Sequence, residues 1–218
     1  MILETRAAPP FFKNGFVLGC EKTRQGIVID PGDEVEELLD AVTTHHLSIQ
    51  YILLTHAHID HITGVAAAKR TLKAPVGLHR ADLFLYEAVV QQGQMLGVPA
   101  SPQPDVDFFY DAAGPWRFGG YGVWVYHTPG HCPGGVCLAV GQDNEPGRQL
   151  FVGDTLFAGS IGRTDLPGGN LETLLRSIGE VLFRFPDDTP VYPGHGEPTT
   201  VGVEKRTNPF LQSLAGNQ

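Results

Sequence analysis

Cysteine, long apolar runs and positive charge are all scarce in this sequence. Its three cysteines, Cys20, Cys132 and Cys137, are odd in number and lack the spacing of a disulfide framework, which argues against a secreted disulfide scaffold. No apolar run nears the roughly 18 residues that mark a membrane-spanning helix. The first residues also lack the basic and apolar regions of a signal peptide. We therefore expect a cytoplasmic protein with no membrane partner.

Acidic residues outnumber basic ones by 24 to 15, and the formal net charge is −9. A surface that binds nucleic acid is normally basic because it neutralises phosphates, so we expect no nucleic-acid partner. A small anionic substrate is still compatible with this charge, because bound cations would dominate the local field. The sequence leaves the oligomeric state open.

The length of 218 residues, 42% of them hydrophobic, fits one globular domain over residues 1–218. Apolar periodicity and turn residues predict strands followed by helices, twice over, which indicates an α/β fold with helices outside two central sheets. Asp33 and Glu36 resemble a capping box at the start of the first helix. The predicted strands cover residues 11–20, 26–30, 50–55, 75–79, 122–127, 135–140, 149–153 and 190–192, and the predicted helices cover 33–46, 61–73, 81–96 and 171–185, with a loop at 98–115 and a short helical tail.

Three histidines and one aspartate crowd the segment that follows the predicted strand 50–55: His56, His58, Asp60 and His61. Imidazole is a common ligand of zinc, copper, iron and nickel, and zinc also accepts carboxylate oxygen. A solvated histidine-rich turn is the alternative interpretation of this segment when it is taken alone.

Three further candidate ligands each follow a predicted strand in a glycine-containing turn: His131, Asp154 and His195. Loops at strand ends, held by a rigid scaffold, are where binding residues gather. Each of the three has a structural interpretation by itself. Together with the histidine cluster they favour a metal site.

Residues 55–61, Thr-His-Ala-His-Ile-Asp-His, resemble the THxHxDH signature of the metallo-β-lactamase superfamily, and the three later residues match its other metal positions in order and spacing. The resemblance covers nearly the whole chain. It implies a four-layer αβ/βα sandwich with two divalent metal ions at one edge of the paired sheets. In this pattern one metal binds His56, His58 and His131, the other binds Asp60, His61 and His195, and Asp154 bridges both.

Within that superfamily, residues 152–169 and 206–211 are similar to the short glyoxalase II-like proteins, which are hydroxyacylglutathione hydrolases and their relatives. Asp154 stands where zinc β-lactamases usually carry cysteine, which favours the same branch. The resemblance implies a hydrolase of a small thioester, namely an S-hydroxyacylglutathione. Full-length glyoxalase II has a C-terminal helical domain that helps to bind glutathione. Only a short stretch follows His195 in this sequence, so we expect no such domain, and the mode of glutathione recognition stays open.

Two divalent ions that share a water lower its pKa from about 15.7 toward about 7, so a metal-bridging hydroxide would attack the carbonyl. A thiol with a pKa near about 8.5 leaves without a general acid, which favours a thioester over an amide. Asp60 is the candidate catalytic residue, as a proton shuttle. Arg163 is a candidate for binding a substrate carboxylate, with a turn held by an Arg163–Asp165 pair as the alternative. Zinc is the expected metal, and iron and manganese accept the same ligands.

A persulfide dioxygenase is the main competing interpretation. Those enzymes are similar to this chain at residues 60–64 and 162–165, and they hold one iron with residues that match His56, His131 and Asp154. The stretch 156–160 is closer to the hydrolase branch. A hydrolase of a lactone, β-lactam or phosphodiester and a non-catalytic module of the same fold are further alternatives.

The case for a functional role is weaker for the remaining histidines and for Cys132. His127 precedes His131 closely and is a candidate for contact with the metal ligands, whereas His45 and His79 are expected to be structural. Cys132 adjoins a ligand but has no free base to activate it, so we expect a small loop residue.

Overall fold

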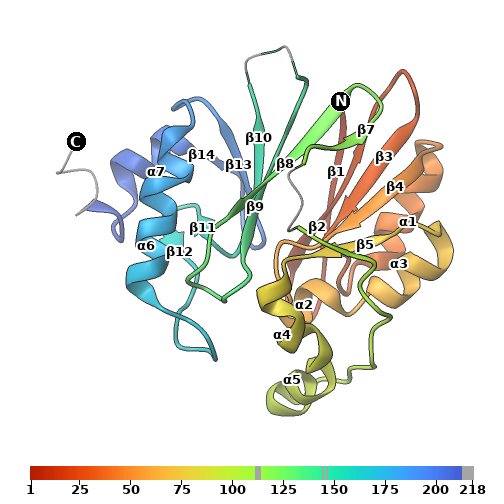
Figure 1. Ribbon diagram of the computed structural model, residues 1–218, viewed down its shortest axis with the longest axis horizontal. Helices are drawn as coiled ribbons and strands as arrows, with labels where there is room; N and C mark the ends of the chain where they lie inside the picture. The colour runs from red at the N-terminus through yellow and green to blue at the C-terminus, as the bar shows by residue number, and fades with distance from the viewer. Residues whose placement is uncertain (111–113, 144, 146, 213–218) are drawn as a thin grey trace.

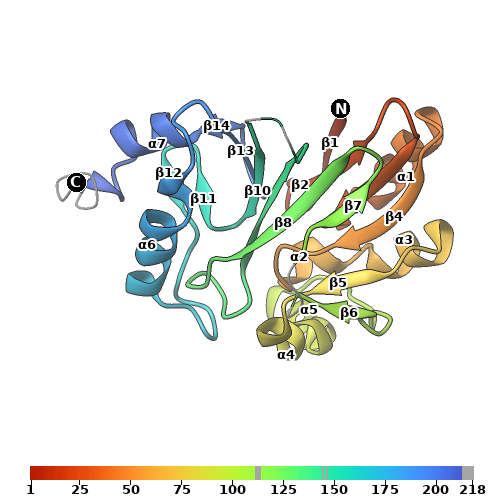
Figure 2. The same ribbon diagram turned by 45° about the horizontal axis from the view of Figure 1, so that its top comes forward.

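Two six-stranded sheets pack face to face, and helices cover their outer faces (Figure 1). The structure is a computed structural model that describes residues 1–110, 114–143, 145 and 147–212. The turned view shows the same four layers (Figure 2). Helices α1 (Val35–Thr44) and α3 (Val65–Leu72) form one outer layer, and helices α6 (Leu171–Glu180) and α7 (Val201–Thr207) form the other. The four-layer αβ/βα sandwich predicted from the sequence is confirmed.

The two sheets divide the chain into an N-terminal and a C-terminal half. The first sheet contains, in spatial order, β1 (Ile2–Ala8), β2 (Lys13–Gly19), β3 (Gln25–Ile29), β4 (Ser48–Leu53), β5 (Val76–Leu78) and β6 (Phe108–Phe109). The second contains β14 (Thr199–Thr200), β13 (Pro190–Pro193), β10 (Gln149–Gly153), β9 (Val136–Gly141), β8 (Tyr121–His127) and β7 (Trp116–Phe118). The shorter elements are α2 (Ile59–Ile62), η1 (Arg80–Asp82), α4 (Leu83–Glu87), α5 (Val89–Leu96), β11 (Leu156–Phe157), β12 (Ser160–Ile161) and η2 (Leu182–Arg184).

Alternate residues of the central strands supply different layers of the core. In β2, Phe16 and Leu18 pack between the sheets, while Val17 packs under the helices of the N-terminal half. In β10, Phe151 enters the space between the sheets, while its neighbours Leu150 and Val152 pack under α6. Successive side chains of a strand point to opposite faces, so a strand buried on both faces reads as a continuous apolar run.

The direction of the strands brings several loops to one edge of the molecule. Strands β3, β4 and β5 are parallel. In the other sheet, β10 is parallel to β13, and β9 is antiparallel to both β10 and β8. Strands β8, β10 and β13 therefore run in the same direction, and the loops that follow them share one edge.

The structure corrects some of the predicted elements. The predicted helix 61–73 is two helices, α2 and α3, and the predicted helix 81–96 is divided into η1, α4 and α5. The edge strand β1 was not predicted, because its half-exposed residues give a weak apolar pattern. The capping box is wrong: Glu34 is the N-cap of α1 and makes no side-chain capping bond. Asp33 instead accepts a hydrogen bond from the hydroxyl of Thr63.

No helix within the described residues is long and apolar enough to span a membrane.

We expect Phe151→Ala to lower the free energy of unfolding by about 3–5 kcal/mol, because it opens a cavity between the sheets. The ring of Phe151 is fully buried, and its centroid lies 5.0 Å from those of both Phe16 and Tyr192. Urea unfolding of the metal-loaded protein measures the change. The control is Phe84→Ala on α4, where the side chain is 49% exposed, and an equal loss in both variants would contradict this account of the core.

Candidate metal centre

All seven predicted metal ligands lie together at the edge where the strands of both sheets end. The N-terminal half supplies its ligands from one segment, the loop after β4 and the short helix α2. The C-terminal half supplies one ligand from each loop that follows β8, β10 and β13. The seven residues are His56, His58, Asp60 and His61 from the first half and His131, Asp154 and His195 from the second.

The ligand atoms gather into three overlapping groups, in each of which all atoms lie within 4.8 Å of one another. One of these, His56, His61 and Asp154, shares a residue with each of the other two. Of those two, the one that we call the three-histidine group brings one ligand from the second half to two from the first. The other, the mixed group, brings a histidine of the second half to an aspartate and a histidine of the first. The three-histidine group is His56, His58 and His131, and the mixed group is Asp60, His61 and His195.

Asp154 lies between the two groups. Its Oδ1 is 3.4 Å from Nε2 of His61, and its Oδ2 is 3.7 Å from Nε2 of both His131 and His195. One carboxylate thus faces a histidine of the three-histidine group and both histidines of the mixed group, as a bridging ligand must.

The residues fit metal ions because several of their buried polar atoms lack any other partner. Among the described residues, Nε2 of His56 and His61 and Oδ1 of Asp154 are buried without a hydrogen bond. Nε2 of His58 is also buried without one, while its Nδ1 lies 2.8 Å from Nε2 of His131. Unpaired buried polar atoms are costly, and a divalent cation satisfies nitrogen and oxygen donors of this kind at once.

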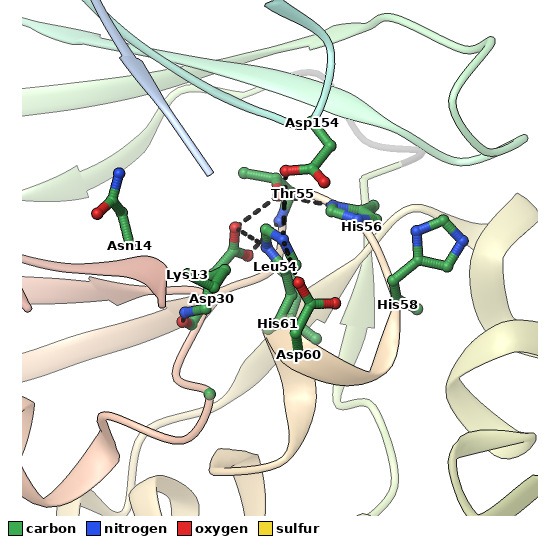
Figure 3. Close-up of polar contacts among 12 residues, drawn as sticks. Lys13, Asn14, Asp30, Leu54, Thr55, His56, His58, Asp60, His61 and Asp154 are labelled. Carbon is green, nitrogen blue, oxygen red and sulfur yellow. Dashed lines mark hydrogen bonds and ion pairs between the residues drawn. The ribbon is translucent and has the colours of Figure 1, made fainter. Parts of the chain in front are cut away.

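Asp30, which directly follows β3, orients two of the candidate metal ligands (Figure 3). Its Oδ2 lies 2.9 Å from Nδ1 of His61 and accepts a hydrogen bond from the Thr55 hydroxyl at 2.5 Å. That hydroxyl lies in turn 3.1 Å from Nδ1 of His56. When Nδ1 donates in each histidine, Nε2 is left free for a metal, and such outer partners fix the ring and its tautomer.

A buried ion pair supports the turn that holds Asp30. Lys13 and Glu34 are each 1% exposed, and their side chains pair at 2.6 Å. The Lys13 ammonium also donates to the backbone carbonyl of Asp30, and the Glu34 carboxylate accepts the Gly32 N–H at 2.9 Å. The charges are therefore fully partnered, which is the condition under which a buried pair is tolerated.

Asp82 joins the two loops that carry the three-histidine group. Its fully buried carboxylate accepts the N–H of Ala57 at 3.1 Å and the N–H of Gly134. It also accepts the thiol of Cys132 at 3.1 Å. Burial raises the pKa of both Asp82 and Cys132. Cys132 is thus a buried loop residue, as expected, and a thiol with a raised pKa is a poor nucleophile.

Burial and neighbouring charges give the two groups different protonation. Burial, reinforced by nearby histidines, lowers the pKa of His56 well below its usual range and that of His58 to about 4. Burial acts the same way on His61, but the surrounding carboxylates, Asp60 foremost, outweigh it and raise the pKa of His61 to about 10. His56 and His58 are therefore neutral at pH 7, whereas His61 must lose a proton to bind a metal.

The other candidate residues lie at the margin of the centre. Nδ1 of His131 lies 2.7 Å from the backbone carbonyl of Arg163, so this residue orients a ligand through its backbone. The Arg163 guanidinium forms two bonds of 2.7 Å with Asp165, which is the turn pair considered above. His127 stacks on His79, and its Nε2 lies 2.8 Å from the Pro133 carbonyl oxygen.

Sequence patterns missed the residues that support the ligands, although their positions just after two apolar strands held a signal. Asp30 and Thr55 each follow an apolar strand, as the ligands do. Gly194 precedes His195, and a Cβ atom there would lie 2.7 Å from Cε1 of His61 and closer still to Asp154. A glycine at this position therefore lets the two halves approach each other at the centre.

The chain belongs to the metallo-beta-lactamase superfamily, since the family model of that name matches residues 8–195. GloC, a hydroxyacylglutathione hydrolase of Haemophilus influenzae, is 35% identical over 204 residues, which are 93% of this chain and 94% of GloC. The chain is thus a hydrolase-like enzyme of this superfamily with a centre able to hold metal ions.

Solved structures show the same fold. The BLEG-1 B3 metallo-beta-lactamase has a TM-score of 0.87 and 35% identity, over 97% of this chain and 100% of that one. TTHA1623 in a di-iron-bound form has a TM-score of 0.82 and 39% identity, over 95% and 100%. ETHE1 from Myxococcus xanthus has a TM-score of 0.79 and 29% identity, over 100% and 86%.

We expect Asp30→Asn to weaken metal binding at the mixed group by about 10- to 100-fold, the usual effect of losing an outer partner. Asparagine fits the left-handed backbone of Asp30 (φ 49°), so the turn is kept, but an amide cannot accept all three hydrogen bonds. Metal titration followed by calorimetry measures the affinity of each ion. The three-histidine group should weaken less, because Asp30 reaches His56 only through the Thr55 hydroxyl. Equal weakening of both ions, or of neither, would contradict this account.

We also expect the two ions to differ in proton release. Because the pKa of His61 is about 10, binding at the mixed group should release about one proton from that residue and tighten about tenfold per pH unit between pH 7 and 9. The dependence should vanish above the pKa of His61. Calorimetry in buffers of different ionisation enthalpy counts the protons, with the three-histidine ion as the internal reference. Proton-neutral binding of both ions would refute the assignment.

Proposed function

We propose that the protein hydrolyses a small thioester, namely an S-hydroxyacylglutathione, and that two divalent ions serve as its cofactors. The observation that carries the proposal is the complete set of seven ligands in two groups sharing Asp154. The likeness to GloC over nearly the full length of both chains supports the choice of substrate. Zinc is the proposed metal, and the di-iron form of TTHA1623 makes iron the first alternative.

Bound divalent ions supply Lewis acidity, which makes a nucleophile from water at neutral pH and stabilises the developing oxyanion. Hydrolysis then breaks the carbon–sulfur bond and releases a carboxylate and a thiol. A thiol of pKa about 8.5 leaves as the thiolate, so no protein acid is required for that step. The histidines of the centre are therefore needed to bind the metal ions, and none of them is needed as a general acid.

Asp60 is the proposed proton carrier. Its Oδ2 lies 3.0 Å from Nε2 of His195 and 3.6 Å from Nε2 of His61, and the residue faces the cleft over the centre. Burial acts to raise the pKa of Asp60, but the charge of His61 outweighs it and lowers the pKa, so Asp60 is ionised before a metal binds. An ionised carboxylate in this place accepts the proton of the attacking water and passes it to solvent.

Arg163 is the proposed contact for a substrate carboxylate. It lines the same cleft as Asp60 and His195, and its side chain is 61% exposed. Its ion pair with Asp165 is at the surface, where such pairs contribute little. The guanidinium can therefore exchange Asp165 for a carboxylate of glutathione.

Persulfide oxidation at a single iron is the second candidate. The observation that favours it is the likeness to ETHE1, together with the presence of His56, His131 and Asp154 in contact with one another. The ligands alone do not separate the two candidates, because the resemblance at residues 60–64 includes Asp60 and His61. The stretch 156–160, which is closer to the hydrolase branch, favours thioester hydrolysis. An iron content near one per chain, together with oxygen consumption in the presence of a persulfide, would make persulfide oxidation the preferred candidate.

The test is thiol release from S-lactoylglutathione by protein whose metal content is known. We expect turnover on the order of about 10 per second, lost in both Asp60→Ala and His61→Ala because each removes a ligand of the mixed group. His45→Ala is the matched control, since His45 contacts Glu4 and lies outside the centre. No thiol release from wild-type protein holding two metal ions would refute the proposed substrate.

A further inference from the structure

A cleft of about 310 Å³ opens directly onto the metal centre. Asp60, Asp154 and three of the histidines form its floor. Its walls are mainly apolar, and they come from both halves of the molecule. The apolar wall residues are Phe11, Ile59, Leu85, Met95, Leu96, Leu166 and Pro167.

The two sides of the cleft differ in charge. The loop between β12 and α6, in the C-terminal half, brings Arg163, which is the one lysine or arginine among the described residues that line the cleft. The opposite side, formed by α4 and α5 of the N-terminal half, brings Leu85, Met95, Leu96 and the amide of Gln92, with no charged side chain. Figure 1 shows α4 and α5 together at the same end of the molecule as α2.

Helix α5 is fixed to the ligand loop by Gln92. Its side-chain oxygen accepts the N–H of Ile59 at 3.0 Å. Its amide donates to the carbonyls of Ala57 at 3.0 Å and Leu85 at 2.8 Å. The apolar side of the cleft is therefore held in a defined position relative to His56 and His58, as a binding wall requires.

Met95 and Leu96 are more exposed than core packing would leave them. Met95 is 77% exposed and Leu96 is 56% exposed. Single exposed apolar residues are common, but these two are adjacent and continue the apolar lining of the cleft. Contiguous apolar surface beside a site is typical of a surface that a ligand covers.

From these observations we infer that the enzyme prefers thioesters with an apolar acyl group, such as an aryl or branched alkyl group, which packs on Met95 and Leu96. This inference rests on the proposed thioester hydrolysis and adds the orientation of the substrate. Glutathione carries two carboxylates, and it belongs on the side of Arg163. With the carbonyl at the metal centre, the acyl group then falls on the uncharged side formed by α5.

The experiment compares kcat/KM for S-mandeloylglutathione and S-lactoylglutathione, which differ in a phenyl against a methyl group. We expect the wild-type enzyme to favour the mandeloyl substrate by about tenfold or more. In the double variant Met95→Gln, Leu96→Gln that ratio should fall by about fivefold or more. Glutamine keeps the helix propensity of α5, and both positions are exposed, so folding is preserved. The intrinsic reactivities of the two thioesters cancel when ratios are compared between variants.

Phe84→Gln is the matched control, because Phe84 is an exposed apolar residue on α4 that does not line the cleft. It should leave both the ratio and the activity unchanged. Arg163→Met should raise KM for both substrates equally and leave the ratio as in wild type. An unchanged ratio in the double variant, or a ratio that responds to Arg163→Met instead, overturns the inference while thioester hydrolysis stands. No hydrolysis of either substrate by the two-metal protein overturns both.

Discussion

The hydrogen bonds of the buried Asp30 carboxylate are the interaction on which the centre depends. Asp30 directly follows β3 of the first sheet, and its oxygens accept hydrogen bonds from the Thr55 N–H, the Thr55 hydroxyl and Nδ1 of His61. One side chain thus sets the position of the ligand loop and the tautomer of two histidines. The buried pair of Lys13 and Glu34 fixes its turn in addition. The Lys13–Glu34 pair thus holds the turn of Asp30. Asp30 in turn holds Thr55 and His61.

The two metal groups differ in charge and in protonation. One is made of neutral imidazoles in a buried setting, and the other contains a carboxylate beside a protonated histidine. A cation at the mixed group gains more from negative charge but must displace a proton. The occupancy of that group then follows pH and metal supply more closely than the occupancy of its neighbour.

The α/β layering and the candidate ligands were predicted from the sequence because strand ends leave strong local signals, whereas the four-layer arrangement came from the resemblance to the superfamily. Apolar runs at 50–55 and 149–153, each followed at once by ligand residues, predicted both the strands and the site. The supporting residues were not readable in this way. Asp82 reaches the loops of His58 and His131 only through a fold that brings sequence-distant segments together. The short strands and the division of the helix at 81–96 depend likewise on tertiary packing, which overrides local propensity.

Each metal group takes ligands from both halves of the chain. His58 and His131 are 73 residues apart in sequence, and Asp60 and His195 are 135 residues apart. A bound ion therefore acts as a reversible crosslink that closes a long loop, and such links restrict the separation of the segments they join. The two sheets cannot part while either ion is held. Loss of the ions would remove this link, so the rate at which the two halves separate would follow the rate at which the metals dissociate.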